Sequence, residues 1–246
     1  REIAVLCASH QAEPFHLEAV QSLLRKAGKS IDNLYVSSLR DTCSGKHAGM
    51  LALAVMLGVE DNHYWYPDHP VQQVMRDAVA ALSSMSPEQL AIGIDGCGVP
   101  VFGMPLMQLA AAYAQLANPG RLSAGRTDAC RTIISAITRQ PQYLAGTNRF
   151  DTALIQVTGG RVIGKMGAEG VYAAAIPQLS VGIALKIDDG AERAIYPAIV
   201  ELLVSLQYIT DSEAGALRAF WKPLLHNRQG DLVGMIEPAV LKPNGQ

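Results

Sequence analysis

The segment LIQVTGGRVIGKMGAEGVYAAAIPQLSVGIALKI, residues 154–187, decides the fold class of this chain. Its apolar and β-branched residues occur in short runs of strand length, separated by glycine, proline and serine, at 154–158, 161–165, 171–176 and 181–187. The pair Gly159-Gly160 between the first two runs is typical of a hairpin turn. The segment therefore predicts an antiparallel meander.

Helical patterns lie on both sides of this meander, because apolar residues recur there at helical spacing between proline and glycine boundaries. The first expected helix begins at Glu13-Pro14 and stops at Gly28, the second carries apolar residues from Met50 onward and ends at Gly58, and the third follows Asp68 to Pro70 and reaches Leu82. Further helices are expected at 106–117, 127–139, 192–206 and 212–221. Further strands are expected at 3–8, 90–94 and 232–237.

Strands at both ends with helices between them indicate a single-domain α+β protein over residues 1–246. We expect the terminal segments to build one sheet flanked by helices, and a mainly helical lobe at roughly 48–140. The sequence Lys165-Met166-Gly167 is similar to the Lys-Thr-Gly strand element of serine β-lactamases and penicillin-binding proteins, where the lysine lines a cleft between two lobes. Alone, this motif is weak, and a solvated lysine at a strand end is its ordinary explanation.

Composition limits the function classes. The chain has 246 residues, of which 49% are apolar and 17% charged, so it can bury a full core. A net charge of −2 without a basic block speaks against nucleic acid as a partner. Neither a membrane-length apolar run nor a signal peptide is found, and the chain opens at Arg1 without Met. We expect a cytoplasmic protein whose N-terminal segment precedes Arg1.

Cysteines mark two glycine-rich junctions. The chain has four cysteines and no C-x-x-C, so reduced thiols are expected. Two of them lie in CSGKH, residues 43–47, and in DGCG, residues 95–98. Free cysteines are usually small buried apolar residues. Cys43, however, lies near an expected helix N-terminus with two basic neighbours, a setting that lowers a thiol pKa.

A thiolate at Cys43 has two uses, and the spacing leaves both open. It could attack an electrophile with His47 as base, or it could join Cys97 on a thiophilic metal such as zinc. In the metal interpretation Lys46 is an unusual candidate ligand, and His47 or Asp95 could orient a ligand or a bound water. The ordinary alternative for Lys46 and His47 is a solvated basic pair on a helix turn.

The dipeptide Ser9-His10 follows the first expected strand, where a catalytic serine could be presented at a sheet edge. Adjacent strand residues point to opposite faces, so this serine and histidine cannot readily act as nucleophile and base. A loop serine without a catalytic role is the better interpretation of the dipeptide alone.

Several stretches together resemble the L-asparaginase II family, the thermolabile type with a serine-β-lactamase-like fold. They are Ala8-Ser9-His10 with Glu13-Pro14, CSGKHAGML, DGCGVP, GTNRFDTAL, KMGAEGVYAAA, GIALKIDDGA and NRQGDLVG, and they extend over almost the whole chain. The resemblance implies hydrolysis of L-asparagine to L-aspartate and ammonia by a homodimer.

The same resemblance implies roles for individual residues. Zinc would be bound by Cys43, Lys46 and Cys97 with water in the open position. A serine–lysine pair would fall on Ser9 and Lys165, with the lysine as base for the attacking hydroxyl. Contacts with substrate or with the metal-bound water would come from His47, Asp95 and Glu169.

Two departures from the family pattern keep alternatives open. The family's N-terminal Ser-x-x-Lys motif does not occur in this chain, and the stretch Val36 to Thr42 is shorter than the family's connection ahead of CSGK. One alternative is a zinc-containing protein that binds asparagine or serves as a scaffold without catalysis. Another is a β-lactamase-like hydrolase of other amides or esters.

Overall fold

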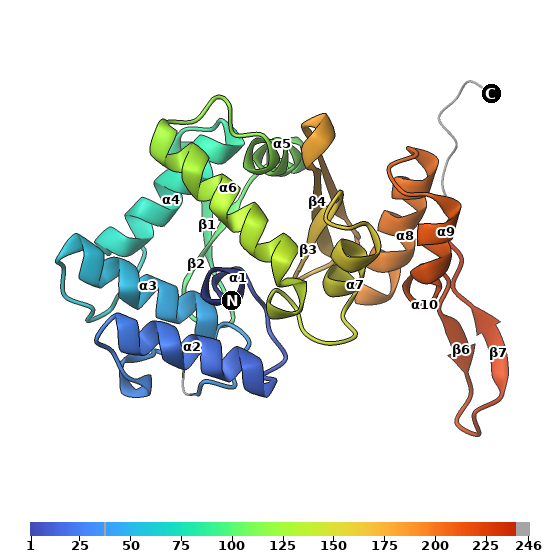
Figure 1. Ribbon diagram of the computed structural model, residues 1–246, viewed down its shortest axis with the longest axis horizontal. Coiled ribbons are helices and arrows are strands. Elements are labelled where there is room, and N and C mark those ends of the chain that lie inside the picture. Colours follow the sequence, from blue (N-terminus) through green and yellow to red (C-terminus); the bar gives the residue numbers. More distant parts are fainter. Residues whose placement is uncertain (37, 240–246) are drawn as a thin grey trace.

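The computed structural model describes residues 1–36 and 38–239 (Figure 1). The single domain expected over 1–246 thus includes residues 37 and 240–246, which lie outside the described part, and residue 37 belongs to the shortened stretch before CSGK. The helices are α1 (Glu2–Leu6), α2 (Pro14–Lys26), α3 (Ser44–Leu57), α4 (Pro70–Ser83), α5 (Leu106–Ala117), α6 (Ala124–Arg139), α7 (Phe150–Val157), α8 (Glu192–Ser205), α9 (Asp211–Ala216) and α10 (Arg218–Trp221). The strands are β1 (Ala91–Ile94), β2 (Pro100–Gly103), β3 (Ile163–Gly167), β4 (Val171–Ile176), β5 (Val181–Lys186), β6 (Leu224–His226) and β7 (Leu232–Met235).

The expected α+β class is confirmed, and most of the meander forms as predicted. Strands β3, β4 and β5 make an antiparallel sheet in that order, with Lys165 opposite Ala173 and Ala173 opposite Ala184. The strand predicted at 171–176 is confirmed residue for residue. A turn at 227–230 connects β6 and β7, which form a separate two-stranded sheet in the described chain.

The expectation that terminal segments build one sheet is wrong for the described residues. The segment 3–8, expected as a strand, lies in and just after helix α1, and the strands form separate sheets β1–β2, β3–β4–β5 and β6–β7. A short apolar run does not distinguish a strand from a buried helix. Here Ala4 and Val5 are fully buried in the core shared with α2 and α3, and Glu2 stands in the first helical turn, where a carboxylate is favoured.

The prediction of a strand at 154–158, the first of the meander, is also wrong, because these residues form the second half of α7 and its C-cap. Phe150 and Leu154 are buried one helical turn apart, which is the spacing of a helix face rather than a strand face. Gly159 and Gly160 have positive φ values of 59° and 81° and end this helix instead of turning a hairpin.

The β3–β4–β5 sheet is covered on both faces. Helix α5 packs against β4 and β5 at Gly182, where a side chain would meet the backbone of Ala110 in α5. On the other face Tyr172, Ala174 and Ile183 belong to a core that also holds residues of α7 and α8. This arrangement places β3, which carries Lys165 at its middle, at the edge of the sheet against α7.

A second core lies among α1, α2, α3 and α4, and Figure 1 shows these helices at the opposite end of the molecule from α8, α9 and α10. The β1–β2 hairpin runs beside α3, and the β6–β7 hairpin extends past α10. No described helix combines the length and the apolar character needed to cross a membrane.

Candidate functional site

The turn before α3 presents the first cluster of predicted site residues. Asp41 Oδ1 accepts a hydrogen bond of 2.8 Å from the backbone N–H of Cys43, so the turn is fixed just before the helix begins. Cys43 is the N-cap residue of α3, and Lys46 lies in its first turn. Side chains three residues apart share a helix face, so the thiol and the amine point the same way.

The turn between β1 and β2 presents the second cluster. The Asp95 carbonyl accepts a hydrogen bond from Gly98 N–H at 2.8 Å, and Asp95 N–H donates to the Val99 carbonyl at the same distance. Gly98 has a φ of +87°, and any side chain there would collide with the ring of Tyr35. The glycine-rich sequence DGCG is therefore what allows a tight turn that aims Asp95 and Cys97 toward α3.

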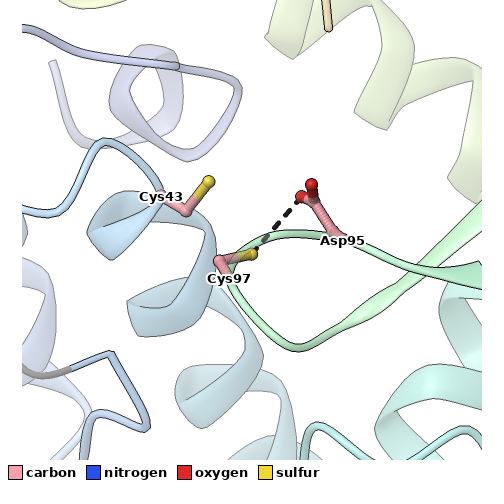
Figure 2. Close-up of side chains that lie close together, drawn as sticks. All are labelled: Cys43, Asp95 and Cys97. Carbon is pink, nitrogen blue, oxygen red and sulfur yellow. Dashed lines mark hydrogen bonds between the residues drawn. The ribbon is translucent and has the colours of Figure 1, made fainter. Parts of the chain in front are cut away.

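These two turns meet, as Figure 2 shows for Cys43, Asp95 and Cys97. The Sγ atoms of the two cysteines and a carboxylate oxygen of Asp95 all lie within 4.8 Å of one another, and this group could hold a metal ion. Cys97 Sγ donates to Asp95 Oδ2 at 3.4 Å. Lys46 Nζ donates to the same oxygen at 2.8 Å. Four of the residues singled out from the sequence are thus brought together.

The charge state of this group favours a thiolate. Interaction with the Cys97 thiol, assisted by the charge of Lys46, lowers the pKa of Cys43 to about 6 despite partial burial. The Cys43 sulfur and burial together raise the pKa of Cys97 to about 12. Burial opposes the charged form of Lys46, but Asp95 and the two sulfurs outweigh it and raise the lysine pKa. Two thiols of which one ionises readily, beside a carboxylate, are a donor set suited to a thiophilic metal.

His47 is fully buried beside this group. Its Nδ1 lies 2.7 Å from the hydroxyl oxygen of Tyr64, which also accepts the backbone N–H of Tyr35 at 2.9 Å. The other ring nitrogen, Nε2, has no hydrogen-bond partner among the described residues. His47 lowers the pKa of the Cys97 thiol, although the Cys43 sulfur and burial raise that pKa overall. The ring itself is shielded from solvent.

Ser9 and Lys165, the expected catalytic pair, are not joined by a hydrogen bond in the described chain. Ser9 is exposed and follows α1, while Lys165 Nζ donates to the Met166 carbonyl at 2.6 Å. Cys7, two residues before Ser9, packs in a small core with Ile163, two residues before Lys165 on the same strand face. The Lys165 charge also lowers the pKa of the Cys7 thiol, although burial raises it overall to about 11. The segment carrying Ser9 and the strand carrying Lys165 are thus neighbours.

Glu169 is placed differently from the other predicted residues. It is exposed in the turn between β3 and β4 with a φ of 60°, beside Gly190, and it makes no hydrogen bond to another described residue. The structure therefore does not bring Glu169 together with Cys43, Asp95 and Cys97.

Two further features were not anticipated. Buried His10 accepts Ala12 N–H at Nδ1, so Nε2 carries the proton and donates to Ser44 Oγ at 2.9 Å; Ser44 in turn donates to the Leu39 carbonyl. The backbone N–H of His10 also donates to the Thr42 carbonyl at 3.2 Å, which joins the segment after Ser9 to the Cys43 turn.

The second feature is Asp151 in α7, whose carboxylate oxygen lies 3.8 Å from Lys165 Nζ. Only the motifs that contain these residues, not their contacts, were visible in the sequence.

A cavity of about 390 Å³ opens beside Lys46 and Asp95. Its remaining wall is mostly apolar and comes from α4, β2 and α5 and the residues next to them, including Met75, Val79, Phe102, Leu109 and Tyr113. A concave site with a few polar groups at one end is typical of small-molecule binding. The polar end here is the Lys46–Asp95 pair, so the group that could hold a metal ion is reachable from this cavity.

A family model matches most of this chain. The family model described as L-asparaginase II matches residues 1–42 and 33–238. The two matched segments overlap at residues 33–42, in the stretch before CSGK. A search of curated proteins returned no match.

Proposed function

Since the chain belongs to the L-asparaginase II family, we propose that it hydrolyses the side-chain amide of L-asparagine to L-aspartate and ammonia. The family match, which extends from residue 1 to residue 238, carries this proposal. It is supported by the meeting of CSGK and DGCG, whose cysteines lie far apart in sequence but face each other beside a cavity.

We propose zinc as the metal, with Cys43, Cys97 and Lys46 as its ligands. A lysine amine must lose one proton to bind a metal and keeps two N–H bonds, one of which can donate to Asp95 Oδ2 as Lys46 does here. His47, with Nδ1 engaged by Tyr64, can donate from Nε2 toward Cys97. When bound, zinc would supply a positive charge that polarises a carbonyl or a water molecule.

In the proposed reaction Ser9 is the nucleophile and Lys165 its base. Burial lowers the pKa of Lys165, which favours a neutral amine able to accept the Ser9 hydroxyl proton. A bond then forms between Ser9 Oγ and the amide carbon of asparagine, and the carbon–nitrogen bond breaks as Lys165 returns the proton to the departing ammonia. Water cleaves the resulting ester, which releases aspartate and restores the Ser9 hydroxyl.

We also propose that the arrangement around Lys165 is of the serine-β-lactamase type. The support is a strand lysine on an antiparallel sheet covered by helices on both faces, next to a segment that carries a serine. The described strands nevertheless form separate small sheets.

Release of ammonia and aspartate from L-asparagine by the protein with zinc tests the function. We expect equal amounts of both products, and a loss on the order of 10³-fold in turnover for Ser9→Ala. Ser212→Ala, at an exposed serine of α9, is the matched control. Absence of ammonia from the parent protein contradicts the proposal. Asparagine binding without turnover in calorimetry would identify a binding protein, and turnover of other amides or esters alone would identify a different hydrolase.

A further inference from the structure

Asp151 occupies an unusual place for a carboxylate. It lies in the first turn of α7, with only 4% of its surface exposed, and α7 covers the outer edge of β3. Its Oδ2 accepts the backbone N–H of Met166 at 3.2 Å and lies 3.8 Å from Lys165 Nζ. Because β3 is an edge strand, the carboxylate replaces the partner that a further strand would have given Met166.

The second carboxylate oxygen points to a role beyond capping a strand edge. Asp151 Oδ1 is buried without a hydrogen-bond partner among the described residues, and so is the hydroxyl of Tyr172, on the neighbouring strand. A buried carboxylate is costly unless it is paired. Lys165 is the only described basic group within 4.0 Å of this carboxylate, so Lys165 is the group whose protonated form Asp151 can stabilise most directly.

We propose that Asp151 is a positioning residue for Lys165, holding the ammonium ion that forms when Lys165 takes the proton from Ser9. This inference rests on the proposed function. In the step concerned, the proton moves from Ser9 Oγ to Lys165 Nζ while the Ser9 Oγ–carbon bond forms and the electron pair of the carbonyl π bond moves to the amide oxygen. Its carboxylate stabilises a charge that appears only as the reaction proceeds, which is the role of the carboxylate in a Ser-His-Asp triad.

The charges that face Lys165 have opposing effects. They come from α7, the turn before α3, and α1, and belong to Asp151, Arg149, Cys43 and Cys7. Burial lowers the lysine pKa most strongly; Asp151 raises it, Arg149 lowers it, and the two cysteines raise it. Removal of the Asp151 charge must therefore lower the pKa of Lys165 further.

The test is the variant Asp151→Asn, in which the shape is kept and the charge is lost. Competitive labelling of lysine amines at a series of pH values, read by mass spectrometry, reports the titration of Lys165 without any substrate. We expect the Lys165 pKa to fall, because the negative charge that favours its ammonium form is lost. We also expect kcat for asparagine to drop by at least about tenfold, with a smaller change in KM and with the acidic limb of the rate profile moved to lower pH.

Two further variants keep the result interpretable. Asp151→Glu retains the charge and should retain the Lys165 titration, whereas Asp189→Asn, at an exposed carboxylate paired with Arg193, should change neither readout. An unchanged Lys165 titration in Asp151→Asn overturns the proposal. If the parent protein releases no ammonia while the labelling shift is seen, the proposed function fails and the pairing of Asp151 with Lys165 stands. If Asp151→Asn does not fold, Asp151→Glu provides the test. A changed Lys165 titration in this variant together with turnover at the parent level overturns the proposal.

Discussion

Cys97 lies in a turn shaped by the Asp95–Gly98 hydrogen bond, which holds its thiol close to that of Cys43. We predict that Cys97→Ser lowers the zinc content from about one per chain to a small fraction of that value, because a neutral hydroxyl is a much poorer zinc ligand than a thiolate. Elemental analysis of purified protein measures this directly. Cys130→Ser, at a buried cysteine of α6, is the control that should keep its zinc, and equal zinc in both variants would disprove the assigned site.

Lys46 and Asp95 share one short hydrogen bond, yet the proposed roles of the two residues differ. We predict that Lys46→Met weakens zinc binding more than Asp95→Asn, since the first removes a ligand and the second only an orienting partner, whose loss costs about 10- to 100-fold in affinity. Competition with a coloured chelator gives both affinities. The reverse order would make Asp95 the third ligand, in line with its place in the cluster with both sulfurs.

At the scale of elements, the sequence predicted those whose pattern is long or clearly bounded. Helix α5 begins and ends where its apolar periodicity predicted, at Leu106 and Ala117, and β4 is confirmed at both ends. Helices α1 and α7 were predicted as strands because runs of five or so apolar residues fit either structure. What decides between them is the core that buries Val5 and Leu154, and that core is a tertiary property.

The same distinction applies to the candidate site, where features visible in a short stretch could be predicted and contacts between distant elements could not. Cys43 and Cys97 could be singled out because glycine-rich junctions are visible locally. The bond between Lys46 and Asp95, and the pairing of Asp151 with Lys165, join elements that are distant in sequence, so no spacing rule reveals them. Asp151 stood in a quoted motif, but its role depends on the open edge of β3.

Two buried histidines, His10 after α1 and His16 in α2, predict a pH dependence of stability. His10 and His16 stack with ring centroids 5.0 Å apart, and both are almost fully buried. Burial, and then the nearby charge of His16, lowers the pKa of His10 from 6.5 to about 4. The unfolded chain therefore binds a proton that the folded chain does not, over the range between these two values.

Stability should thus be full above pH 6.5 and fall as the pH drops from about 6.5 to about 4, by about 3 kcal/mol from His10 alone. His16, whose pKa is also lowered by burial, adds to this slope. Urea unfolding at intervals of pH measures the free energy of unfolding. In His10→Gln the slope of the free energy of unfolding against pH should decrease by the equivalent of close to one bound proton. His226→Gln, at an exposed histidine, serves as the comparison. An unaltered slope in His10→Gln would show that His10 does not titrate in this way.

At the scale of the whole molecule, α5 connects the two cores. It packs on β4 and β5 through one face and contacts α4 and α6 elsewhere (Figure 1). Its residues Leu109 and Tyr113 line the cavity beside Lys46. Helix α5 therefore lies between this cavity and the sheet that carries Lys165. Gly182 is the residue that permits the close packing of α5 on this sheet.

We predict that Gly182→Ala destabilises the protein by roughly 3 kcal/mol, because the added methyl group meets backbone atoms of Ala110 and Ala114 that cannot rotate away. Gly125→Ala is the matched control: this exposed glycine lies in the first turn of α6, with nothing within 4 Å of an added Cβ, and its replacement should leave stability unchanged or raise it by up to about 1 kcal/mol. Urea unfolding compares the two. Relief of the overlap must move α5 away from the sheet, so Gly182→Ala should turn over asparagine more slowly even under conditions in which it is fully folded. Equal stability and turnover in both variants would show that this contact does not join the two halves of the site.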